Sequence, residues 1–230
     1  MNNRFNDMRA NIASASSATT VLDGSAHRVL RNTYMLLSLC LAFSALTAGA
    51  SIALGLPHPG LIITMVGYFG LLYLVTKNRD SGLGVGLVFA LTGFMGYTLG
   101  PIISMYLKLP NGGQTVMMAM GGTAAIFLAL SAYALVSKRD FSFMGSFLMV
   151  GILVAFLAGL AGIFMQIPAL SLTVSAVFVL LMSGLILYQT SEIIRGGETN
   201  YVMATVTLFV TIFNLFTSLL QLLGFANSSD

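Results

Sequence analysis

Five polar residues recur along the last apolar segment of the chain, which otherwise consists mainly of Leu, Phe, Val and Ile. They are Thr207, Thr211, Asn214, Ser218 and Gln221. Spacings of 4, 3, 4 and 3 residues place all five on one helix face, which we do not expect to contact lipid. This stripe predicts either hydrogen bonding between helices or the lining of an ion or proton path. Thr and Ser can bond to their own helix, whereas Asn214 and Gln221 are expected to need partners elsewhere.

A second polar group precedes this segment, where Gln189 and Glu192 share one helix face. We expect Glu192 near the membrane surface, and an ionisable group at that depth is a candidate functional residue. Two roles are open for it: transport, or an ion pair with a basic residue on the same side of the membrane. The candidate latch partners are Lys77, Arg79 and Arg195.

The sequence offers no set of residues from which an enzyme active site could be built. It has no HExxH zinc pair, no Walker motif, no paired aspartates in facing segments and no lysine in the last segment for a retinal Schiff base. His27 and His58 are expected in different connections and cannot share a metal. The single cysteine, Cys40, is expected to be apolar filler. We therefore expect no enzymatic activity, metal or cofactor.

The composition is that of a membrane protein. Of 230 residues, 57% are hydrophobic and 7% are charged, and the mean hydropathy is +0.92. Soluble domains carry about 25% charged residues, so a cytosolic enzyme and a disordered chain are both excluded. The net charge of +3 is scattered between apolar segments, so the expected partner is the lipid bilayer and not a nucleic acid.

Charge-free intervals, two of them split near prolines, predict an all-α bundle of seven membrane spans, because a spanning helix needs about 20 apolar residues. The predicted spans are 33–56, 61–76, 82–107, 115–136, 141–164, 169–190 and 201–225. Residues 33–225 thus form the membrane domain, between an N-terminal tail (1–32) and a short external tail (226–230). Asp140 is expected to cap the start of the fifth span.

The basic residues predict the orientation of the bundle. Nine of the ten Lys and Arg residues fall before the first span or in alternate connections on the same side, and only Lys108 falls on the other. Positive charge stays in the cytoplasm, so we expect a cytoplasmic N-terminus and a periplasmic C-terminus.

Small residues along the third span predict close helix packing in lipid. Gly86, Gly93 and Gly100 recur every seven residues, and Gly96 lies between them. An alternative is that Gly100 and Pro101 break this helix beside a transport pathway.

Several stretches resemble the Bax inhibitor-1 family of transmembrane proteins. They are residues 93–101, 131–145, 186–197 and 208–216, and the similarity extends from about residue 28 to residue 225. Residues 28–34 and 196–201 are similar to those of bacterial inner-membrane members that are substrates and modulators of the membrane-anchored protease FtsH. The resemblance implies a seven-helix bundle with the last helix surrounded by the others, and a cytoplasmic tail that the protease engages.

Other members of the family are calcium leak channels in which two aspartates share a proton and latch the pore. Here Gln189 and Thr211 occupy those positions, and neither side chain can titrate. Two functions therefore stand: a regulatory protein that binds, is degraded by and modulates FtsH, or a cation leak, with calcium as the ion, that lacks the two-aspartate latch. The loss of both aspartates favours the first.

Overall fold

The computed structural model describes the backbone of residues 2–228 and the side chains of residues 24–227. Within this part of the chain every regular element is helical, which confirms the all-α prediction. The helices are α1 (Asn2–Ala53), α2 (Leu61–Lys77), α3 (Gly82–Leu107), α4 (Gly112–Ser137), the short 3-10 turn η1 (Ser142–Met144), α5 (Gly145–Met165), α6 (Pro168–Arg195) and α7 (Tyr201–Ser228).

Helix boundaries follow local chemistry. Pro168 is the first residue of α6, where its missing N–H would have no partner within the helix. The same helix ends at Gly196, which adopts a left-handed conformation with φ 76°. The N–H of Gly197 then donates to the carbonyl of Glu192 at 2.9 Å, closing the last turn.

The largest differences from the predicted spans lie at the start of α1 and at the end of α6, which extends to Arg195 where the predicted span ends at residue 190. No helix boundary occurs near residue 33, because α1 runs without interruption from Asn2 to Ala53. The fifth apolar segment begins at Ser142, one residue after the predicted start of the span. Its first three residues, Ser142–Met144, form a 3-10 turn, and α5 begins at Gly145.

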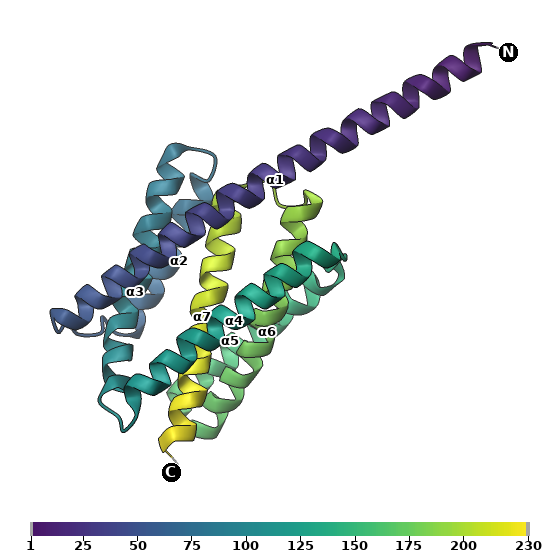
Figure 1. Cartoon of the computed structure of the whole chain (residues 1–230). Helices are drawn as coiled ribbons and strands as arrows, with labels where there is room; N and C mark the ends of the chain where they lie inside the picture. The colour runs from purple at the N-terminus through teal and green to yellow at the C-terminus, as the bar shows by residue number, and fades with distance from the viewer. Residues whose placement is uncertain (1, 229–230) are drawn as a thin grey trace.

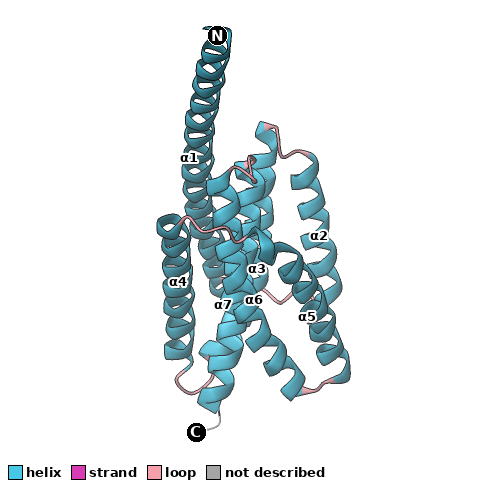
Figure 2. Ribbon diagram, turned by 90° about the vertical axis from the view of Figure 1, so that its right-hand side faces the viewer, coloured by secondary structure: helices cyan, strands magenta, loops and turns pink. Residues whose placement is uncertain are grey.

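The helices form two groups that share α7. α1 packs most extensively on α3, which also contacts α2, while α6 contacts α4 and α5. α7 contacts α1, α3, α4 and α6, and it runs between the two groups (Figures 1 and 2). Half of its most apolar stretch is buried inside the protein, against 17% for the stretch that contains α5. The last helix is therefore the most deeply buried of the six long apolar helices.

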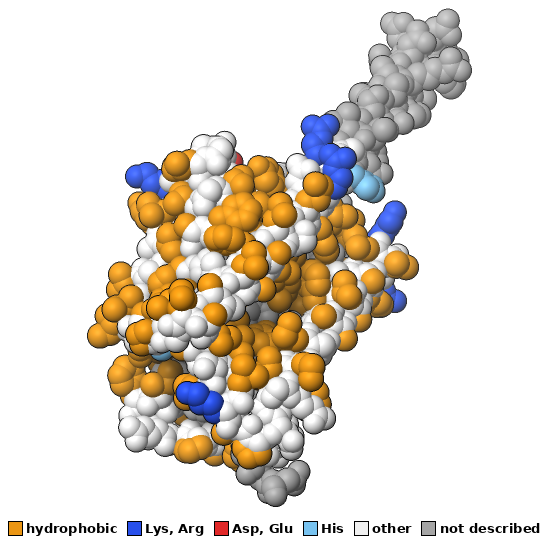
Figure 3. All heavy atoms as spheres, turned by 60° about the vertical axis from the view of Figure 1, so that its left-hand side comes forward, with side chains coloured by type: hydrophobic (Ala, Val, Ile, Leu, Met, Phe, Trp, Pro, Cys, Tyr) orange, Lys and Arg blue, Asp and Glu red, His pale blue; other side chains and the backbone are white. Residues whose placement is uncertain are grey.

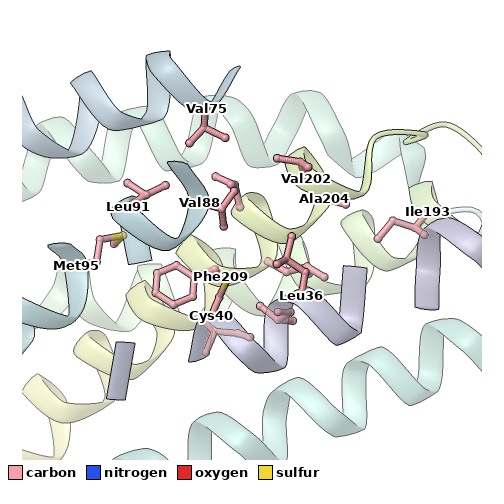
Figure 4. Packing of buried hydrophobic residues seen from close by; sticks show 14 residues of the cluster. Leu36, Cys40, Val75, Val88, Leu91, Met95, Ile193, Val202, Ala204 and Phe209 are labelled. Atoms are coloured by element: carbon pink, nitrogen blue, oxygen red, sulfur yellow. The ribbon is translucent and has the colours of Figure 1, made fainter. Parts of the chain in front are cut away.

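The main apolar core forms where α1, α3 and α7 meet. Figure 4 shows Phe209 of α7 surrounded by Leu36 and Cys40 of α1 and by Val88 and Leu91 of α3. All five side chains are buried. Cys40 is thus part of the core, as its sequence context predicted.

The outer surface is suited to lipid. Six helical segments are long and apolar enough to cross a membrane, and large apolar side chains of α5 such as Phe147, Met149 and Phe164 are exposed. Figure 3 shows apolar side chains spread over the visible face of the bundle. The seventh helix, α2, has 17 residues and is about 25 Å long, slightly shorter than a bilayer core of about 30 Å.

α1 extends well beyond the bundle at its N-terminal end (Figures 1 and 2). Its 52 residues correspond to a helix of about 78 Å, more than twice the thickness of a bilayer core. The membrane-compatible segment of this helix, Gly24–Ala53, accounts for 30 residues. The helix is therefore too long to lie within the bilayer along its whole length.

Candidate functional site

The polar stripe of α7 faces the interior of the protein, as its spacing predicted. Thr211 and Ser218 are buried, and Thr207, Asn214 and Gln221 are half-buried. The hydroxyl of Thr211 donates to the backbone carbonyl of Thr207 at 2.6 Å. This residue is therefore satisfied within its own helix.

The two amides of the stripe find partners in different ways. The side chain of Asn214 donates to the carbonyl of Val210 at 2.8 Å, so the expectation that it needs another helix was wrong. Asn214 lies four positions after Val210 in the same helix, so its side-chain amide can reach the second lone pair of the Val210 carbonyl. Gln221 does reach another helix, because its oxygen accepts a bond of 2.6 Å from the hydroxyl of Ser175 in α6.

Gln189 is one of three described residues with a buried polar side-chain atom that has no hydrogen-bond partner. It is 6% exposed, and its amide nitrogen has no hydrogen-bond partner among the described residues. The hydroxyls of Thr33 in α1 and Ser131 in α4 are also buried without a partner. A buried donor without an acceptor costs about 1–3 kcal/mol, so this end of α6 carries unused hydrogen-bonding capacity.

Glu192 is half-buried near the C-terminal end of α6. Its carboxylate lies against the loop after α6, where a Cβ on Gly197 would collide with its Oε2 atom. Neither described salt bridge involves Glu192. Instead, the guanidinium of Arg195 binds Asp140 at 2.9 Å, although the two residues are far apart in the sequence. Arg195, one of the three candidate partners of Glu192, is therefore paired with Asp140 instead.

Asp140 fixes the connection between α4 and α5. It accepts a hydrogen bond from the backbone N–H of Ser142 at 2.9 Å. The residues that precede η1 and α5 are Phe141 and Met144, so the prediction that Asp140 caps the start of the fifth span was wrong. Hydrogen bonds from Ser142, and then the charge of Arg195, hold the pKa of Asp140 below its usual value of 3.8. Ser191 of α6 joins the same connection by donating to the carbonyl of Arg139 at 3.1 Å.

Neither of the other two latch candidates forms a salt bridge with Glu192. Arg79 makes an exposed contact with its neighbour Asp80 at 3.6 Å, and Lys77 ends α2. Asn200, just before α7, donates to Asp80 at 2.7 Å. Asn200 and Ser191 thus connect the loops at this end of the bundle. Neither residue could be singled out from the sequence, because each is of a common type and belongs to no distinctive pattern.

The glycines of α3 pack against α1. A Cβ on Gly93 would lie 2.7 Å from the ring of Phe43, and one on Gly100 would lie 2.6 Å from Ser51. On Gly96 a Cβ would collide with the carbonyl oxygen of Ser44. At these three positions the absence of a Cβ therefore allows α3 to pack closely against α1.

Gly86 and Pro101 differ from the predicted pattern. A Cβ on Gly86 would meet no atom within 4 Å, because this residue is exposed and the packing face has rotated away from it. Pro101 lies inside α3, which continues to Leu107, so the alternative of a broken helix is wrong.

These observations define a multi-pass helical membrane protein whose interior polar residues are held mainly by hydrogen bonds. Among the described residues, no three His, Cys, Asp or Glu side chains are grouped so that they could hold a metal ion. The chain belongs to the Bax inhibitor-1 family, since the family model described as "Inhibitor of apoptosis-promoting Bax1" matches residues 26–228.

Relatives from bacteria cover nearly the whole chain. A protein of Escherichia coli K12 named "Modulator of FtsH protease YccA" is 53% identical over 216 residues, which are 94% of this chain and 97% of that protein. The same values hold for "Inner membrane protein YccA" of E. coli O6:H1. An uncharacterized protein of Pseudomonas aeruginosa PAO1 is 52% identical over 202 residues, covering 88% of this chain and 91% of its own.

The resemblance to the Bax inhibitor-1 family, and within it to the YccA-like members, is thereby confirmed. Together with the apolar helices, these relatives support a multi-pass protein of the inner membrane.

Proposed function

We propose that this chain is an inner-membrane regulatory protein that binds the FtsH protease, modulates its work and is itself degraded by it. The observation that carries the proposal is the 53% identity, over 94% of the chain, to a protein named as a modulator of that protease. In this proposal the chain performs no chemistry of its own. Its contribution is a surface that docks on the protease complex within the bilayer.

The proposed topology has seven crossings, a cytoplasmic N-terminus and a periplasmic C-terminus. The distribution of basic residues supports this orientation. α2 completes the count, because Lys77 at its end can extend its charge to the membrane surface and so compensate for the short helix. α7 is the central helix of this arrangement, supported by its contacts with both helix groups.

In the same proposal, the segment before residue 33 is the handle for the protease. The length of α1 supports this role, because the helix extends past the bundle at the end that the charge pattern assigns to the cytoplasm. A terminal segment outside the packed core is easily engaged and pulled.

The test is to follow the protein in cells with active protease, with inactive protease and with no protease. We expect FtsH to co-purify with the tagged chain, and the chain to decay only where the protease is active. Deleting residues 2–25 should prolong its lifetime. An unchanged decay rate would refute the handle, and failure to co-purify with inactive protease would refute the binding proposal.

A cation leak is the second candidate function, and the observation that favours it is the half-buried carboxylate of Glu192, which takes part in neither of the described salt bridges. Calcium prefers oxygen ligands, and Glu192, Asn214 and Gln221 could supply some of them. This function ranks below regulation because Asn214 and Gln221 already have hydrogen-bond partners.

Calcium flux into liposomes containing the purified chain tests the leak. A conducting stripe predicts that Asn214→Leu with Gln221→Leu abolishes flux while the protein stays folded. Thr173→Val is the control, because this exposed threonine bonds only to the carbonyl of Ala169 in its own helix. Absence of flux from the unmodified chain would eliminate the leak and leave the regulatory proposal unaffected.

A further inference from the structure

A groove of about 650 Å³ lies between α1 and the end of α4, at the level where α1 extends beyond the bundle. Its apolar wall includes Leu30 and Tyr34 of α1 and Leu135 of α4. Its polar rim includes Arg28 and Arg31. The groove thus combines an apolar surface with a cationic edge.

The two arginines are placed to act together. Residues three apart lie on the same face of a helix, so both guanidinium groups reach one region. Both side chains are exposed, and neither forms an ion pair with a residue whose side chain the structure describes. None of the lining residues is acidic. Their charges are therefore available to an anion from outside the chain.

The groove lies at a boundary between apolar and polar sequence. Arg31 is the last charged residue of α1 before a charge-free stretch that extends to Lys77. α4 ends at Ser137, and Lys138 and Arg139 follow directly. Figure 3 shows Lys and Arg side chains gathered at this end of the bundle, with apolar side chains adjoining them. Such a boundary corresponds to the headgroup layer of a bilayer.

We propose that this groove is a binding site for one anionic phospholipid from the adjacent leaflet. The phosphate of the headgroup accepts charge-assisted hydrogen bonds from Arg28 and Arg31, because a planar guanidinium matches phosphate oxygens. An acyl chain lies along the apolar wall formed by Leu30 and Leu135. A free phosphate ion would leave this wall unfilled, and a zwitterionic lipid would bring no net charge to the rim.

Native mass spectrometry of the full chain in detergent tests the proposal, with phosphatidylglycerol or phosphatidylcholine of identical acyl chains added. We expect one tight phosphatidylglycerol adduct. Each basic residue near a membrane surface contributes about fivefold to anionic lipid binding, so Arg28→Gln with Arg31→Gln should weaken the adduct about thirtyfold. Lys77→Gln with Arg79→Gln removes the same charge elsewhere and should leave the tight adduct in place.

A second variant tests the apolar wall without changing any charge. Leu135→Trp places a bulkier side chain on the apolar wall, so we expect it to weaken phosphatidylglycerol binding while both arginines remain. Excess inorganic phosphate should not compete with the lipid. Unchanged binding in the Arg28→Gln, Arg31→Gln protein would overturn the proposal. An equal loss of lipid binding in the Lys77→Gln, Arg79→Gln control would also overturn it, because it would indicate general charge attraction. Displacement of the lipid by phosphate would overturn it as well, because it would indicate a simple anion site.

Discussion

Replacing Gly96 by Ala tests whether the contact between α1 and α3 holds the first helix group together. The added Cβ would collide with the backbone carbonyl oxygen of Ser44 and with the side chain of Thr47. A hydroxyl can rotate away, but the carbonyl belongs to the backbone of α1. The two helices must therefore separate, and the neighbouring contacts at Gly93 and Gly100 loosen with them.

The matched control is Gly86→Ala, in the same helix, where a Cβ meets nothing within 4 Å. Each replacement removes the intrinsic penalty of glycine in a helix, about 1 kcal/mol. This gain cancels when the two variants are compared. Overpacking of a close contact costs about 1–3 kcal/mol, so the free energy of unfolding should be lower for Gly96→Ala than for Gly86→Ala by that amount.

The assay is reversible unfolding in mixed detergent micelles, followed by circular dichroism as the fraction of denaturing detergent rises. We expect the Gly86→Ala midpoint at or above that of the unmodified protein, and the Gly96→Ala midpoint clearly below that of Gly86→Ala. Equal midpoints for the two variants would show that α1 does not approach α3 closely at Gly96, and the packing argument would fail.

Three further changes follow from the polar contacts. Gln189→Leu should raise the free energy of unfolding by about 1–3 kcal/mol in the same assay, because it removes a buried donor without a partner; a loss would reveal a partner for this amide. Gln221→Leu should cost about 1 kcal/mol by leaving Ser175 unpaired, and Ser175→Ala should remove that cost. The lowered pKa of Asp140 adds stability that is present above its unfolded pKa, about 4, and is lost as pH falls through the folded value. Asp140→Asn should therefore flatten the acid side of the pH–stability curve, and an unchanged curve would contradict this.

The sequence by itself determined the helical segments and most of their ends. Long charge-free runs must be helical in lipid, because every backbone polar group then needs a partner within the segment. The start of α3 at Gly82 and of α7 at Tyr201 matched the prediction. The stripe on α7 could also be assigned to the interior, since periodicity alone fixes which residues share a face.

Contacts between segments were decided only in three dimensions. Spacing grouped Gly86 with Gly93, but the angle at which α1 crosses α3 brings only the second against Phe43. Charge alone suggested Glu192 as a partner for Arg195, whereas the fold brings Asp140 to it from the connection between α4 and α5. Whether a segment enters the membrane depends on the length and hydropathy of that segment alone, so the sequence predicts the membrane segments. Pairing depends on the distance between residues far apart in the chain, and only the packed bundle sets that distance.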